Sequence, residues 1–172
     1  MLRNTDQSAT ADVPVTAAKP NLRIVVDDLS GPEIAVLLTE HVAELARHSP
    51  ADSMHALDLD ALRRPEITFW SGWDGDTLAG CAALKRLDNE HAEIKSMRTA
   101  ATHKRRGVAS ILLRHLLTEA KARGYRRMSL ETGTPEFFIP AQKLYAAHGF
   151  EFCEPFGDYA PDPYSHFMTR PL

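Results

Sequence analysis

Cysteine is scarce in this chain of 172 residues, since Cys81 and Cys153 are its only two. They lie far apart and form no CxxC spacing, so the sequence encodes neither a zinc ribbon nor a thioredoxin-like redox pair. Two buried free thiols in a reducing compartment are the expected state, and a single disulfide between them is the alternative.

Long apolar runs are absent as well. No stretch approaches the ~18 consecutive apolar residues of a membrane-spanning helix, so no membrane association is expected. Residues 1–20 are polar and small and lack the apolar core of a secretory signal. We therefore expect a flexible tail over residues 1–20, one domain over residues 21–172, and a cytoplasmic location.

An excess of positive charge is also missing, because the net charge is −3. The charge is unevenly distributed, however: residues 103–127 hold eight Lys or Arg residues and one acidic residue, a local +7. A nucleic-acid-binding module is disfavoured, because this segment lacks interleaved aromatic residues and the remaining −10 would repel a long polyanion. A concentrated cationic segment in an acidic chain indicates a local anionic ligand instead.

The hydrophobic pattern predicts a single mixed α+β domain. Alternating or β-branched runs separated by short turns predict seven strands, at residues 22–26, 67–73, 77–87, 91–99, 126–132, 150–154 and 165–172. Apolar residues at three- and four-residue steps predict four helices, at residues 31–48, 58–64, 107–123 and 138–149. Ser30 is a candidate N-cap of the first helix. The order β-α-α-β-β-β-α-β-α-β-β favours a sheet with helices on both faces.

The segment KRRGVAS, from Lys104 to Ser110, places three cations before Gly107 and the start of a predicted helix. Cations are unfavourable at the positive end of a helix dipole, so a negative partner is expected there. The free amides of a helix start, reached closely because Gly107 has no side chain, suit phosphate oxygens. The alternative is a basic surface loop with a turning glycine. The segment is neither a P-loop nor a dinucleotide fingerprint.

With its context, the segment resembles the Gcn5-related N-acetyltransferase (GNAT) superfamily. That family's phosphate loop, Gln/Arg-x-x-Gly-x-Gly/Ala, is matched by KRRGVA, with Lys104 as a mild departure. A later signature, Ala-x-x-Leu-Tyr-x-x-x-Gly-Phe, is matched at Ala141, Leu144, Tyr145, Gly149 and Phe150. Together with the order of elements, the resemblance covers residues 22–172.

The resemblance implies a GNAT fold: a twisted, mostly antiparallel sheet of about seven strands, splayed in the middle. It implies acetyl-CoA as co-substrate. No metal is expected, because the spacing of His41, Glu44 and His48 does not match HExxH and no cysteine is close. The pyrophosphate would lie on the amides of residues 105–110, and pantetheine would pair with the strand at residues 97–99. The residues implied to bind the cofactor are Met97, Arg98, Thr99, Lys104, Arg105, Arg106, Gly107, Val108, Ala109, Ser110 and Gln142. The Arg98 side chain could reach phosphate or face water, and water is favoured.

The resemblance also implies two catalytic residues. Tyr145 would protonate the departing CoA thiolate; the alternative is a core aromatic residue. Glu93 would help to deprotonate the amine; the alternative is a solvated carboxylate paired with Lys95 or Lys85. Strand alternation predicts that Glu93, Lys95, Met97 and Thr99 share one face.

The expected function is transfer of the acetyl group of acetyl-CoA to an amine of a small molecule or peptide by direct attack. No cysteine is placed for a covalent intermediate. A catalytically silent acyl-CoA-binding sensor is the alternative.

Phe138 occupies a position where many relatives carry Asn, and it is expected to line the pocket. Similar proteins are commonly dimers, so a homodimer is compatible with the resemblance. Weaker candidates for acceptor contacts or polar groups are His48, Asp52, His55, Asp58, Glu131, Thr132, Asp158 and Tyr159.

Overall fold

The computed structural model describes residues 19–172, so the predicted tail at residues 1–20 lies outside the described residues except for its last two. The strands are β1 (Arg23–Val26), β2 (Ile67–Asp74), β3 (Thr77–Arg86), β4 (His91–Thr99), β5 (Arg127–Gly133), β6 (Glu151–Cys153) and β7 (Ser165–Pro171). The helices are α1 (Pro32–Leu45), α2 (Leu59–Leu62), α3 (Val108–Ala122) and α4 (Ile139–Ala147). Short 3₁₀ turns at Ala51–Ser53, Ala101–His103 and Glu136–Phe138 are inserted between them. The predicted order of helices and strands is confirmed.

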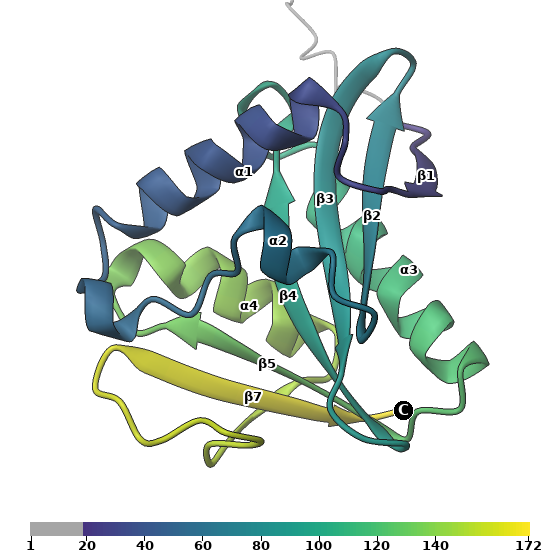
Figure 1. Cartoon of the computed structure of the whole chain (residues 1–172). Coiled ribbons are helices and arrows are strands. Elements are labelled where there is room, and N and C mark those ends of the chain that lie inside the picture. The colour runs from purple at the N-terminus through teal and green to yellow at the C-terminus, as the bar shows by residue number, and fades with distance from the viewer. Residues whose placement is uncertain (1–18) are drawn as a thin grey trace, which may run out of the picture.

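The seven strands form one sheet in the order β1-β2-β3-β4-β5-β7-β6. Every neighbouring pair is antiparallel except β4 and β5, which run parallel. The pairing of β4 with β5 covers only four residues of each strand and ends at Ile94 opposite Leu130. Beyond that point the two strands diverge (Figure 1), which confirms the predicted splay in the middle of the sheet.

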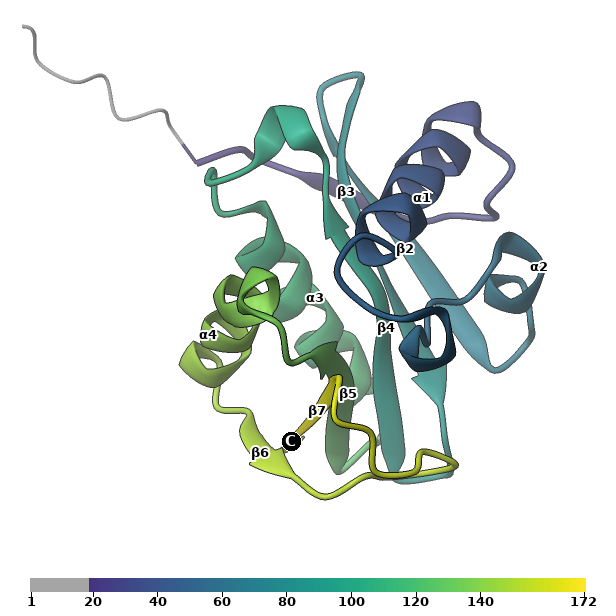
Figure 2. The same ribbon diagram turned by 90° about the vertical axis from the view of Figure 1, so that its left-hand side faces the viewer.

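Helices cover both faces of the sheet, with α3 and α4 on one side and α1 and α2 on the other (Figure 2). The α3 side holds the larger apolar cluster, in which Leu112, Leu113 and Leu116 are at most 1% exposed. The α1 side holds a smaller cluster built around Ile34 and Leu62. Burial of these side chains removes apolar surface from water and stabilises the three-layer arrangement.

Local sequence signals explain where the helices begin and end. Pro32 occupies the first turn of α1, where its missing N–H would have no helical partner. The prediction that Ser30 is the N-cap is wrong, because Gly31 occupies that position. The Ser30 N–H donates a hydrogen bond to the Asp28 carboxylate. Helix α3 is followed by Gly124 with a φ of 84°, a left-handed conformation that costs glycine little.

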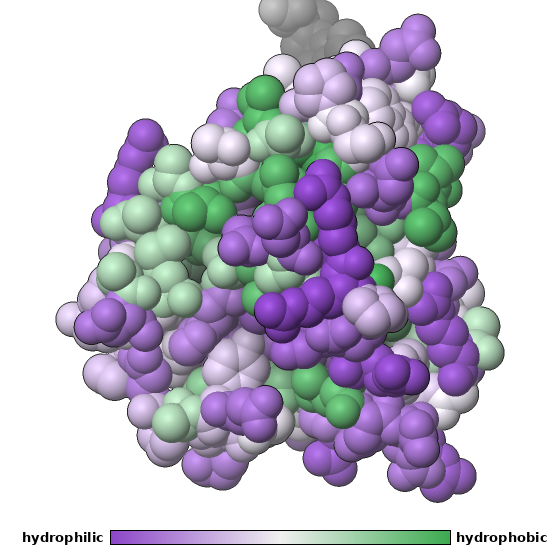
Figure 3. Space-filling model, in the orientation of Figure 1, coloured by the Kyte–Doolittle hydropathy of each residue, from purple (hydrophilic) through white to green (hydrophobic). Residues whose placement is uncertain are grey.

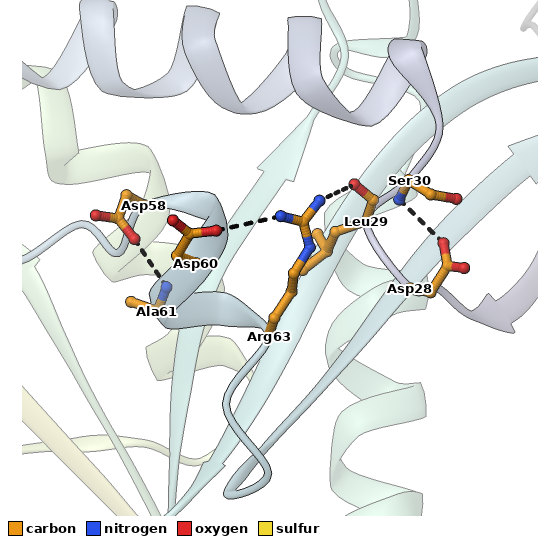
Figure 4. Close-up of polar contacts among 7 residues, drawn as sticks. All are labelled: Asp28, Leu29, Ser30, Asp58, Asp60, Ala61 and Arg63. Carbon is orange, nitrogen blue, oxygen red and sulfur yellow. Dashed lines mark hydrogen bonds and ion pairs between the residues drawn. The ribbon is translucent and has the colours of Figure 1, made fainter.

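The short helix α2 is tied to the segment that precedes α1 (Figure 4). Asp58 caps α2 by accepting a hydrogen bond of 2.8 Å from the Ala61 N–H. Arg63 donates to the Leu29 carbonyl at 2.9 Å and to Asp60 at 3.3 Å. These bonds fix the end of the loop that crosses from α1 to β2.

Strand β4 contains an irregularity that reverses its side-chain alternation. Lys95 lies opposite Ala83 and Arg98 opposite Cys81, so the register shifts there, and Ser96 has a φ of 48°. Met97 consequently packs with the α3-side cluster, whereas Arg98 contacts α1. The prediction that Met97 shares a face with Glu93 is therefore wrong, because strict alternation does not survive a bulge.

Within the described part of the chain, no helix is both long and apolar enough to traverse a bilayer.

Candidate active site

A cleft of about 460 Å³ lies where β4 and β5 diverge, between α1, the loop after it, and the start of α4. Apolar side chains gather over this side of the molecule, between α1 and α4 (Figure 3). Its wall combines apolar residues, among them Leu45, Met54, Phe137, Phe138 and Pro140, with polar ones, among them His41, Glu44, His55, Lys95, Arg98, Lys104, Glu131 and Tyr145. Phe138 was predicted to wall the pocket, and it does.

One edge of β4 is exposed to this cleft. Lys95, Arg98 and Thr99 pair with β3 on one side, but none of residues 95–99 has a partner in β5, whose pairing stops at Ile94. Met97, Arg98 and Thr99, the predicted pantetheine residues, all line the cleft. Unpaired strand edges present backbone N–H and C=O groups, so an extended ligand could add as a further strand.

The predicted phosphate loop leads into α3. Gly107 is the N-cap, with a φ of 84°, and no side chain caps the helix. Among the described residues no hydrogen-bond partner is found for the N–H groups of residues 108–110. The Val108 side chain itself is buried in the core, so only its amide faces outward. The first turn of α3 therefore keeps free donors and the positive end of the helix dipole.

Two of the three cations before α3 have carboxylate partners within the protein. Arg106 donates to Asp74 of β2 at 3.1 Å, and the His103 ring lies 3.2 Å from the same carboxylate. Lys104 Nζ lies 3.7 Å from Glu44 Oε1. Arg105 has no acidic partner among the described residues. The negative charges expected near these cations are therefore partly supplied by the protein's own Glu44 and Asp74, and Asp74 holds the loop in place.

Tyr145 of α4 lines the cleft and is 7% exposed. Its ring packs edge-on against Phe150 at 5.8 Å, so it is part of the core, as the alternative interpretation predicted. No hydrogen-bond partner of its hydroxyl is found among the described residues. Burial, with a smaller contribution from the charge of Glu131, raises the pKa of Tyr145, which keeps the phenol protonated at neutral pH.

Glu93 belongs to a buried cluster beneath the cleft. It is 1% exposed, accepts a hydrogen bond of 2.5 Å from the Tyr159 hydroxyl, and lies 3.3 Å from Lys95 Nζ. Lys95 also donates to Tyr159 at 2.8 Å and to the His55 carbonyl at 3.0 Å. Glu93 is thus paired with Lys95, as one interpretation predicted, but it is enclosed rather than solvated, and it is absent from the cleft wall.

Arg98 does not face water. Its side chain is 13% exposed and forms an ion pair with Glu44 of α1, so the predicted solvent exposure is wrong. The bulge at Ser96 explains the difference, because it turns Arg98 toward α1. The pair links β4 to the helix that covers it and neutralises a cation at the cleft wall.

His41, also on the cleft wall, is held neutral by its surroundings. Burial and, secondarily, the charge of Arg98 lower its pKa from 6.5 to about 4. The unfolded chain therefore binds a proton near pH 6.5 that the folded protein resists, so stability falls with decreasing pH below 6.5. From these values we expect a loss of about 2 kcal/mol between pH 7.5 and pH 5 from this residue.

The measurement is urea unfolding at the two pH values for the wild type and His41→Asn. The variant should lose about 2 kcal/mol less than the wild type over this interval. Thr39→Asn, at an exposed position of α1, changes no titratable group, so it is the control and should keep the wild-type dependence. An unchanged pH dependence in His41→Asn would contradict the assignment.

Glu131, at the open end of β5, was only a weak candidate from the sequence. It lines the cleft half-buried, and the Ser165 hydroxyl donates to its Oε1 at 2.8 Å. Burial raises the pKa of Glu131, against the opposing effect of the Ser165 hydrogen bond. The sequence predicted only that Glu131 lies at the end of a strand. It could not predict the hydrogen bond from Ser165, because that residue is 34 positions away.

Several predicted residues lie outside the cleft wall. Gln142 donates to the Gly133 carbonyl at 2.7 Å, and the Ser110 hydroxyl lies 3.0 Å from the His148 ring. Cys81 and Cys153 are both free, and burial raises the pKa of Cys81 to about 12. Neither thiol lines the cleft. Residues 19–172 contain no cluster of three or more His, Cys, Asp or Glu side chains suited to a metal ion.

The splayed sheet, the uncapped helix start and the cleft between them define an acyltransferase architecture. The model of the acetyltransferase (GNAT) family matches residues 34–150, and the chain belongs to this family.

The chain is similar to the "Uncharacterized N-acetyltransferase YsnE" of Bacillus subtilis, with 56% identity over 88% of this chain and 100% of that protein. It is also similar to the "IAA acetyltransferase" of Azospirillum brasilense, with 35% identity over 89% and 99% of the two chains. A GNAT acetyltransferase from Elizabethkingia anophelis, solved with acetyl-CoA bound, has the same fold, with a TM-score of 0.62, 18% identity, and coverage of 88% and 99%. The protein is therefore an enzyme of the acetyltransferase class.

Proposed function

We propose that the protein transfers the acetyl group of acetyl-CoA to the amine nitrogen of a small molecule or peptide by direct attack. The observation that carries this proposal is the unpaired edge of β4 at residues 95–99, which leads from the free amides of α3 into a cleft lined by Tyr145. A relative of the same fold is described with acetyl-CoA bound, which supports this cofactor.

In this proposal the pyrophosphate binds the amides of residues 105–110, where the positive end of the α3 dipole favours an anion. Lys104, Arg105 and Arg106 supply charge around it. Pantetheine pairs with residues 97–99, and a backbone N–H near Met97 polarises the thioester carbonyl. Gln142 acts indirectly at most, because its amide holds the Gly133 carbonyl.

Tyr145 donates a proton to the sulfur of the departing CoA. A residue that stays protonated at neutral pH and lacks a competing partner can make this donation. Glu93 was the sequence-based choice for the base. Since Glu93 is 1% exposed, lies outside the cleft wall and has its Oε1 in contact with Tyr159 and Lys95, we propose for it a supporting role beneath the cleft.

The experiment that tests the function is thiol release from acetyl-CoA over a panel of primary amines. The panel should contain butylamine, spermidine, phenethylamine, tryptamine and α-amino acids, with acetyl-CoA affinity measured by calorimetry in parallel. Turnover with at least one amine is expected. Tight acetyl-CoA binding without turnover on any amine would instead favour the sensor function, and absence of binding would overturn both.

The phosphate loop makes a separate prediction. The double variant Arg106→Ala, Gly107→Val removes one cation and forces a β-branched residue into a left-handed backbone position. We expect acetyl-CoA affinity to fall at least about tenfold, because a lost charge-assisted contact and a strained loop each cost about 1 kcal/mol or more. Unchanged affinity would defeat the loop assignment. The control Arg126→Ala removes an exposed cation and should leave affinity unchanged.

We also propose a cytoplasmic location, supported by two free cysteines. A homodimer is a further proposal, because dimers are common among similar proteins.

A further inference from the structure

Glu131 lines the cleft, one residue past the point where the pairing of β4 with β5 ends. Its side chain is half-buried. The Ser165 hydroxyl of β7 donates to Oε1 at 2.8 Å and fixes the carboxylate from below. No second hydrogen bond is found among the described residues, so Oε2 is available to a ligand or water.

Glu93 differs in its exposure and in its place relative to the cleft. It is 1% exposed and takes no part in the cleft wall. Its carboxylate already accepts from the Tyr159 hydroxyl and lies 3.3 Å from Lys95 Nζ. A general base must come within hydrogen-bond reach of the proton that it removes, directly or through one water. Glu131 lines the cleft in which the amine would lie, whereas Glu93 lies outside the cleft wall and is 1% exposed.

We propose that Glu131, held by Ser165, is the group that accepts the proton of the attacking amine. This assignment rests on the proposed acetyl transfer and adds its missing base. Ser165 acts through Glu131 and is therefore a positioning residue.

The electrostatic surroundings are consistent with this role. Burial is the largest influence and raises the pKa of Glu131, which makes it a stronger base than a solvated carboxylate. The charged or titratable groups around it come from several elements: Lys95 and Glu93 of β4, His55 of the loop after α1, Tyr145 of α4 and Tyr159 of the β6–β7 loop. His55 and Lys95 oppose the increase, and Glu93 adds to it.

The proton balance of the reaction is then complete. The protonated amine gives one proton to Glu131, and the freed lone pair forms a bond to the thioester carbon. The C–S bond breaks as the tetrahedral intermediate collapses, and sulfur takes a proton from Tyr145. The nitrogen loses its second proton to water in the cleft, which balances the proton that Tyr145 must recover. The products are the amide and free CoA thiol, and Glu131 returns its proton to solvent.

The same proton transfer assists Tyr145. The negative charge of Glu131 contributes to the raised pKa of Tyr145. Once Glu131 has accepted the amine proton, it is neutral, and this contribution disappears. Tyr145 therefore becomes a better donor at the stage when the thiolate leaves.

The test is Glu131→Gln, which keeps the shape of the side chain and its hydrogen bond to Ser165 but cannot accept a proton. With the most active amine of the panel, we expect kcat/KM at pH 7 to fall about 100-fold, with acetyl-CoA affinity unchanged. The defect should shrink as the pH approaches the amine's own pKa, because more amine then arrives unprotonated. Glu151→Gln, an exposed carboxylate of β6, is the matched control and should retain wild-type rates.

Ser165→Ala tests the positioning role. The hydroxyl stabilises the charged form of Glu131, so its loss should move the acidic limb of the kcat/KM profile to higher pH. A merely structural role would lower the rate without moving that limb.

Wild-type activity in Glu131→Gln, or a defect that is the same at every pH, would overturn the assignment. A Glu93→Gln variant that alone abolishes the acidic limb would overturn it as well. If the wild type releases no thiol with any amine, the proposed function itself fails, and this assignment fails with it.

Discussion

Tyr145→Phe is expected to lower kcat by about 10²- to 10³-fold without weakening acetyl-CoA binding. General acid assistance is typically worth about 10²- to 10⁴-fold. The effect should lie in the lower part of this range, because a thiol with a pKa of about 8.5 leaves tolerably well unassisted. The measurements are thiol release at saturating amine and calorimetric affinity for acetyl-CoA.

The structure indicates that this variant removes the hydroxyl without disturbing the packing of the ring. The Tyr145 hydroxyl has no hydrogen-bond partner among the described residues, and the ring contact with Phe150 does not need it. The thermal unfolding temperature should therefore be unchanged. Tyr125→Phe removes a hydroxyl from another partly buried tyrosine beside the same apolar cluster and should leave kcat unchanged. A Tyr145→Phe enzyme within threefold of the wild type would leave Tyr145 as a core aromatic residue only.

The order and type of the elements could be predicted from local signals. Turns such as Asp74-Gly75-Asp76 separate alternating runs, and Gly124 and Gly149 end helices in left-handed conformations. These signals act within a few residues, so the sequence reports them directly. The strand β6 was predicted at residues 150–154 but covers only Glu151–Cys153, since strand ends depend on the partner.

The direction of side chains on β4 could not be predicted in the same way. Alternation extrapolated through Ser96 misplaced Met97 and Arg98, because one extra residue in a strand reverses every later side chain. The bulge depends on the pairing with β3, and a single strand's sequence carries no sign of it. The wrong face predicted for Met97, one of the predicted pantetheine residues, follows from this one extra residue.

Charge partners distant in sequence were similarly hidden. The cations of the phosphate loop were visible as an excess, but their partners, Glu44 and Asp74, are about 60 and 32 residues away. Tyr159 is 66 residues from Glu93. Local patterns indicated which types of side chain lie near the cleft. Only the fold shows that the Glu131 carboxylate lines the cleft whereas that of Glu93 does not.

Lys95→Met is expected to destabilise the protein by about 3–5 kcal/mol. Lys95 is 8% exposed and its ammonium reaches Glu93, Tyr159 and the His55 carbonyl, so the change leaves a buried carboxylate without its counter-charge. Removing one partner of a buried ion pair typically costs this much, whereas removing both costs less. The measurement is urea unfolding followed by circular dichroism at neutral pH.

The double variant Glu93→Gln, Lys95→Met supplies the decisive comparison. Because it leaves no uncompensated charge, it should be more stable than Lys95→Met alone, and the two single losses should not add. Lys121→Met, on the exposed face of α3, is the control and should change stability by less than about 0.5 kcal/mol. Additive losses would mean that Glu93 and Lys95 are energetically independent. The Glu93–Lys95 pair would then not hold the loops that carry His55 and Tyr159 in place, and the supporting role assigned to Glu93 would be wrong.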